Sequence, residues 1–352
     1  YQSALDVSLS SGDIELANEI RSTAAAAYET LGKTSGAIEM LENIGSDLAS
    51  GEDTEAGQEL AVTLFEKGRI LNGNYRYAEA AAELEQSLSL QRSKAALRPW
   101  GATGLELAQS YYSMGEMEQA ASLMLESIPR TPVSAHTAEL ITAYGALASI
   151  YRGNGQFREM DEYREKQSAL AGAGPHRPDV LFQSALDALE RDGRGSDRAG
   201  RLFANSVAAA RKAGDVLAEN RARLHLCVHR LEAGGANACG DREVQTSHGE
   251  LEASGIPVLT LDADFARARI HSLRGRYREA LADMDRMTRE LLFLRQSLSG
   301  VLGAWYWLNR TAIFHEYMSI SLALSRGETG NGNAGKLPLL SLDRIRPVSY
   351  TH

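Results

Sequence analysis

The chain has 352 residues and a formal net charge of −9; 43% of its residues are hydrophobic and 24% are charged. This composition excludes a disordered chain and is typical of a folded soluble protein. Because a general nucleic-acid-binding protein needs a basic surface, the acidic balance argues against nucleic acid as a partner.

Glycines recur along the chain at a spacing of about 40 residues. In the clearest copies a small or apolar residue follows the glycine by five positions, as in YETLGKTSGA, YYSMGEMEQA, YRGNGQFREM and HSLRGRYREA. These copies contain Gly32 and Ala37, Gly115 and Ala120, Gly155 and Met160, and Gly275 and Ala280, and weaker copies stand at Gly73, Gly195 and Gly235. A period of this length predicts an array of stacked units.

The unit around Gly115 is predicted to be a helix, a glycine turn and a second helix. Small and apolar residues share one face of each helix: Leu107, Ala108 and Tyr111 before the turn, then Ala120, Met124 and Ser127 after it. The glycine would end the first helix in a left-handed conformation, and the small Ala120 would let the second helix approach closely. One pair cannot bury both faces, so neighbouring pairs must stack.

The segments LAQSYYSMGEMEQA, LASIYRGNGQFREM and RGRYREALADM resemble the tetratricopeptide repeat, here with a longer second helix. The resemblance implies an all-α fold, a right-handed α-solenoid of about fifteen to seventeen antiparallel helices. About seven repeats would occupy residues 1–287. It also implies a non-catalytic scaffold that binds a peptide or helix of another protein in a concave groove.

In this family the first helix of each unit lines the groove. The positions next to the packing face are therefore the expected partner-binding residues: Arg69, Asn72, Gln109, Tyr112, Ser149, Arg152, His225 and His229.

The only two cysteines are Cys227 and Cys239, which form no disulfide framework. We therefore expect unpaired thiols, with Cys227 in the core, and a reducing cytoplasmic compartment. His225, His229, Cys239 and His248 match no zinc spacing, so no metal site is expected.

Residues 288–327 lack a repeat glycine and are predicted to be a helical cap on the array. Arg295 and Arg310 interrupt the most apolar stretch, residues 291–314, which therefore predicts a buried helix and no membrane span. The order Ala304-Trp305, Arg310, Phe314, Tyr317 and LLSLDRIR resembles the segment that joins repeat arrays to caspase-like CHAT protease domains. This resemblance implies an alternative, a regulatory arm whose partner is a domain of the same longer chain. A sensor arm of a transcription regulator is a further alternative.

Residues 328–352 are predicted to be a linker and a truncated, partly non-native tail, and the first residue, Tyr1, suggests that the native N-terminus is missing. GNGNAGKL resembles a phosphate-binding loop but has Leu337 where a hydroxyl residue is needed. Asp283 and Asp285 are expected on a solvated helix face rather than as an acid–base pair. The sequence therefore predicts no enzyme activity and no cofactor.

Overall fold

The computed structural model describes residues 1–49, 54–93, 100–234, 239–297, 313 and 315–325. Helices and no strands form in these residues, which confirms the predicted all-α fold. The helices are α1 (Gln2–Ser11), α2 (Ile14–Thr30), α3 (Thr34–Leu48), α4 (Thr54–Gly73), α5 (Tyr77–Ser93), α6 (Gly101–Met114), α7 (Met117–Ser127), the short 3-10 helix η1 (Ile128–Arg130), α8 (Thr137–Gly153), α9 (Phe157–Ala171), α10 (Arg177–Asp192), α11 (Asp197–Ala213), α12 (Val216–Glu232), α13 (Asp241–Ala253), α14 (Pro257–Leu273) and α15 (Tyr277–Ser297).

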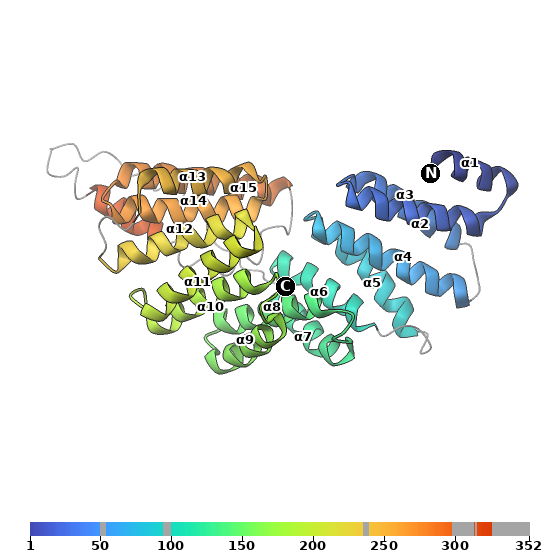
Figure 1. Cartoon of the computed structure of the whole chain (residues 1–352), viewed down its shortest axis with the longest axis horizontal. Coiled ribbons are helices and arrows are strands. Elements are labelled where there is room, and N and C mark those ends of the chain that lie inside the picture. Colours follow the sequence, from blue (N-terminus) through green and yellow to red (C-terminus); the bar gives the residue numbers. More distant parts are fainter. Residues whose placement is uncertain (50–53, 94–99, 235–238, 298–312, 314, 326–352) are drawn as a thin grey trace.

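The helices pack as consecutive hairpins in one curved array (Figure 1). After α1, the hairpins are α2–α3, α4–α5, α6–α7, α8–α9, α10–α11, α12–α13 and α14–α15. Figure 1 shows α1–α5 at one end, α6–α9 in the middle and α12–α15 at the other end. None of the described helices is long and apolar enough to cross a membrane.

The turn at Gly115 has the geometry expected from the sequence. Gly115 has φ of 87°, in the left-handed region, and its N–H donates to the carbonyl of Tyr112 at 3.0 Å. The next N–H, of Glu116, donates to the carbonyl of Tyr111 at 2.9 Å. These two bonds satisfy carbonyls at the end of α6 and reverse the chain into α7.

The second unit departs from the predicted register. Gly73 belongs to α4, and the left-handed residue is Tyr75, with φ of 62°. The N–H groups of Tyr75 and Arg76 donate to carbonyls of Asn72 and Leu71, the same pattern as at Gly115. Tyr75 therefore takes the place of the turn glycine, and the prediction at Gly73 is wrong by two residues. In another unit the turn residue lies two positions earlier than predicted, because Gly193 has a positive φ of 84° and Gly195 does not. Gly234 also has a positive φ, of 90°, and the predicted Gly235 lies outside the described residues.

The predicted close approach of paired helices is confirmed. Ala37, Ala120 and Ala280 have no exposed surface, and Met160 is also buried. Met124 and Ser127, one and two turns beyond Ala120, are fully buried as well. Tyr111, in contrast, was expected in the core but is only half-buried, because its ring borders a surface cleft between α5 and α7.

The C-terminal end of the array is covered by further helix. Residues 315–325 are helical, and Tyr317 and Ile320 are buried in one cluster with Leu261 and Met284. The Tyr75 and Tyr77 rings, from the distant α4–α5 turn, pack against this same cluster. The array therefore bends far enough for its α4–α5 hairpin to meet its C-terminal end.

Several sequence motifs lie outside the described residues. These are Ala304-Trp305, Arg310, Phe314, GNGNAGKL, LLSLDRIR and the final PVSYTH. The division into residues 1–287, 288–327 and 328–352 stays a prediction.

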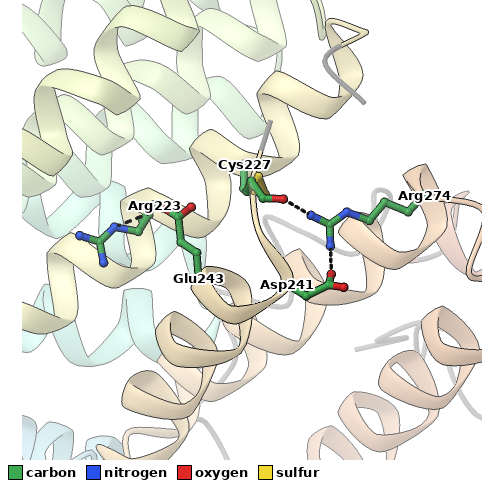
Figure 2. Close-up of a disulfide and its surroundings, with 6 residues drawn as sticks. Arg223, Cys227, Asp241, Glu243 and Arg274 are labelled. Carbon is green, nitrogen blue, oxygen red and sulfur yellow. Dashed lines mark hydrogen bonds and ion pairs between the residues drawn. A yellow bond between two sulfur atoms is a disulfide. The ribbon is translucent and has the colours of Figure 1, made fainter. Parts of the chain in front are cut away.

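The two cysteines form a disulfide, which corrects the expectation of unpaired thiols. Cys227 lies on the buried face of α12, as predicted, and Cys239 returns beside it with a Cα–Cα distance of 5.9 Å. Figure 2 shows the setting: Arg274 of α14 donates to the carbonyl oxygen of Cys239 at 2.6 Å and also binds Asp241. The pairing depends on how α13 packs against α12, which sequence spacing alone does not reveal.

Candidate functional site

Polar side chains form a continuous row across the first helices of successive hairpins. Each link in this polar row joins one first helix to the next: Glu29 to Arg69, Asn72 to Glu106, Tyr112 to Ser149, Arg152 to Asp187, Arg221 to the ring of Phe182, and Arg221 to Asp262. The row therefore runs from α2 to α14. It recurs because stacking brings the same face of every first helix against its neighbour.

The N-terminal part of the row is acidic, with Arg69 lying among Glu29, Glu66 and Glu106. Arg69 makes two hydrogen bonds of 2.9 and 2.8 Å to the carboxylate of Glu29 and a third to Glu66. The bonds to Glu29 raise the pKa of Arg69 above its usual range. Asn72 is buried and donates to the side chain of Glu106 at 2.9 Å. Burial raises the pKa of Glu106, against the opposing effect of Asn72.

The centre of the row carries an excess of positive charge. The Asp187 carboxylate forms ion pairs with Arg164 at 2.7 Å and with Arg152 at 3.2 Å, so two guanidinium groups share one carboxylate. Tyr112 lies beside this group, with its hydroxyl close to Ser149. Burial raises the pKa of Tyr112, while the positive charges of Arg152, Arg164 and a third arginine, Arg221, oppose that shift. The Tyr112 hydroxyl therefore faces a positive environment.

Farther along, Asp262 of α14 is held by Arg221 at 2.8 Å and by Nε2 of His225 at 3.1 Å. Burial alone would raise the pKa of Asp262, but the charges and hydrogen bonds of His225 and Arg221 lower it well below its usual range. The Arg221 guanidinium also lies 4.1 Å from the centre of the Phe182 ring. The five charged groups Arg152, Arg164, Arg221, Asp187 and Asp262 thus sum to one positive charge.

The structure places most of the predicted groove residues in this row, namely Arg69, Asn72, Tyr112, Ser149, Arg152 and His225. The other two form none of these links between first helices. Gln109 donates to Ser113 of its own helix at 3.2 Å. His229 is buried against α11, where a Cβ on Gly200 would come within 2.6 Å of its Nε2, so it packs two helices together.

The sequence analysis missed the acidic members of the row. Glu106, Asp187 and Asp262 all bind side chains of a neighbouring first helix. The available signal was an acidic residue inside an otherwise apolar helix, as in VLFQSALDAL and PVLTLDADFA. Such a residue needs a partner to be buried, and its partners lie 34 to 41 residues away.

A second ionic network lies among α13, α14 and α15. The Asp264 carboxylate pairs with Nε2 of His248 at 2.6 Å and with Arg286 at 2.6 Å. The Asp283 carboxylate pairs with Arg267 at 2.7 Å and with His271 at 2.9 Å. Asp283 was predicted on a solvated face, but it is buried. The prediction is wrong because Arg267 and His271 of the stacked helix α14 cover that side of α15.

A sequence model described as the tetratricopeptide repeat matches residues 143–178, which include the turn at Gly155 and all of α9. The described helices thus form an array of hairpins with one stretch that matches this repeat. The curved stack of hairpins and the motif around Gly155 agree on this point. No curated protein matches the sequence.

Two solved structures are similar to this array in their backbone fold. One is a signal-transduction ATPase with a tetratricopeptide repeat sensor from Pyrococcus horikoshii, at 14% identity and a TM-score of 0.47. The match covers 84% of this chain and 47% of that one. The other is yeast Tom70, at 13% identity and a TM-score of 0.39, covering 90% of this chain and 63% of that one. The array thus spans less than two thirds of either protein.

Proposed function

We propose that the array is a protein-interaction scaffold, and that it binds an acidic peptide segment at the centre of the polar row. The observation that carries this proposal is the excess positive charge around Tyr112. A carboxylate from a partner would meet Arg152, whose guanidinium uses one terminal nitrogen for Asp187. Hydrogen bonds between a guanidinium and a carboxylate are among the strongest in proteins.

The hydroxyl of Tyr112 adds a directional contact to this charge. A phenol offers a flat apolar ring together with one polar tip, which suits a segment carrying an apolar residue beside an acidic one. The contacts within the row also hold these side chains in place before any partner arrives. Preorganised anchors of this kind reduce the entropy lost on binding.

The test is peptide binding measured by fluorescence anisotropy. The probes are a labelled peptide rich in Asp, Glu and Leu, and the matching peptide with Asn and Gln in place of the acidic residues. Arg152→Ala with Tyr112→Ala should weaken binding of the acidic peptide by roughly 2 kcal/mol or more. The fold should survive, because Arg164 remains on Asp187.

The matched control is Arg158→Ala, which removes an exposed positive charge from α9. This variant should bind like the unmodified protein. Equal binding of the acidic and amide peptides, or full affinity in the double variant, would reject the polar row as the binding surface.

The alternative is that the array is the regulatory arm of a longer chain ending in a CHAT-type protease or joined to a transcription regulator. It rests on the order of Trp305, Arg310, Phe314 and Tyr317 in the joining segment. The adjoining genomic reading frame tests it. A downstream domain with a catalytic His and Cys would support this alternative, and a stop codon directly after the cap would reject the protease.

A further inference from the structure

A second candidate surface lies between α5 and α7. An open cleft of about 890 Å³ separates these two helices, and α6 forms its floor. The floor is apolar, made by Leu88, Leu107, Leu123 and the ring of Tyr111. The short side chains of Ser89 on α5 and Ser122 on α7 also line the cleft, and in the described part of the chain they leave space between the two helices.

This cleft is separate from the polar row. Its floor residues on α6 are Leu107 and Tyr111, whereas the row uses Glu106 and Tyr112 of the same helix. At 3.6 residues per turn, successive residues are about 100° apart, so each row residue points about 100–140° away from each floor residue. A ligand in the cleft and a ligand in the row would therefore not collide on α6.

The rim of the cleft is acidic. Among the described residues that line it are Glu85, Glu118 and Glu126 and one positive side chain, Arg92. Arg92 is already engaged, because it binds Glu126 at 2.8 Å and stacks 4.4 Å from the Trp100 ring. The hydroxyl of Tyr111 donates to Glu85 at 2.6 Å, which fixes that carboxylate above the floor. Within the described lining, Glu85 and Glu118 thus give the rim a net negative charge.

The dimensions favour a helix as the occupant. The lining extends from Glu85 to Ser93 on α5 and from Glu118 to Glu126 on α7. Each stretch rises by about 12 Å, slightly more than two helical turns. That length matches apolar side chains at positions i, i+4 and i+7 of a docked helix, the usual spacing of anchors in helix-in-groove recognition.

We propose that this cleft binds an amphipathic helix of a partner protein, with three aliphatic side chains on the floor and Lys or Arg residues facing Glu85 and Glu118. The apolar floor supplies the burial, and the acidic rim selects a basic helix over an acidic one. The array then has two independent binding surfaces of opposite charge preference.

The experiment uses the whole chain and a labelled synthetic helical peptide of about four turns, with Leu at i, i+4 and i+7 and flanking Lys. A second peptide carries Glu in place of each Lys. Anisotropy should show saturable binding of the Lys peptide that weakens as salt rises, and roughly tenfold weaker binding of the Glu peptide. No saturable binding of the Lys peptide, or equal binding of both peptides, would overturn the proposal.

Two variants act on the cleft by different means. Glu85→Lys with Glu118→Lys reverses the rim charge and should weaken Lys-peptide binding by about tenfold or more. Ser122→Trp fills the space from an exposed position and should remove binding without touching the core. The matched control is Glu165→Lys on α9, which makes the same charge change at an exposed site outside the cleft. Unchanged affinity in both cleft variants overturns the proposal, as does equal weakening in the control.

The test of the cleft can be separated from the test of the polar row. Arg152→Ala with Tyr112→Ala should leave Lys-peptide affinity unchanged, because neither residue lines the cleft. A joint loss in that variant would mean that the two surfaces are one site, which also overturns the proposal.

Discussion

Reduction of the Cys227–Cys239 disulfide should loosen the α12–α13 hairpin. The bond joins residues 12 positions apart. For a loop of that size the chain-entropy relation gives about 9.5 cal/mol/K, or about 2.8 kcal/mol at 25 °C. The loss applies to the opening of α12–α13, since a repeat array opens locally and not as one two-state unit.

Hydrogen exchange followed by mass spectrometry measures this opening directly. A loss of about 2.8 kcal/mol corresponds to roughly 100-fold faster exchange of the protected amides in α12 and α13 after addition of a reductant. Amides of α2 and α3, far along the array, should not change. Cys239→Ser serves as the control, because it removes the bond while keeping the buried Cys227.

In that control, exchange should be fast with or without the reductant. Two results would refute the reasoning. One is an unchanged exchange rate in the reduced unmodified protein. The other is a mass that shows two free thiols after oxidative refolding, because the cysteines would then not be paired at all.

Three further predictions concern packing and charge. Ala120→Leu should overpack the α6–α7 contact and cost about 1–3 kcal/mol, seen as a lower urea midpoint. Gly101→Ala should cost a similar amount, about 1–3 kcal/mol, because its Cβ would lie 2.6 Å from the backbone of Arg130; an unchanged midpoint would mean that the backbones are farther apart. The folded state lowers the pKa of Asp262, so its stabilising effect is full above about pH 4 and is lost as the pH falls further. Asp262→Asn should therefore flatten the acid limb of a plot of urea midpoint against pH, and an identical acid limb would contradict the assignment.

The local features of the repeat could be predicted because they depend on neighbours in the sequence. The turn at Gly115 needs a glycine, and the close helix approach five residues later needs a small side chain. Both requirements arise within a single hairpin. Tyr75 marks the limit of this rule. A tyrosine in the left-handed region costs about 1–2 kcal/mol of backbone strain. The packing of Tyr75 against the distant C-terminal cluster offsets this cost, and no local sequence pattern encodes that packing.

For the candidate site, the sequence predicted which helix positions face the row but not which side chains bind one another. The periodic pattern identified Tyr112, Ser149 and Arg152 as facing the same way, since that follows from the helical repeat. Their partners could not be found in this manner, because the choice of Asp187 as the acceptor for Arg152 depends on how two hairpins stack. The Cys227–Cys239 bond was missed for the same reason: it depends on the path of a connection and not on periodicity.

The contact of Tyr75 and Tyr77 with the C-terminal cluster changes how force and motion pass through the molecule. In an open stack each hairpin contacts only its neighbours, so it can bend with little effect on distant hairpins. Here the α4–α5 hairpin also contacts the C-terminal cluster, so the hairpins between these two points are constrained from both sides. Bending at any hairpin between them then either strains that contact or breaks it. Separating the aromatic contact is thus the step that would release the intervening hairpins to change curvature together.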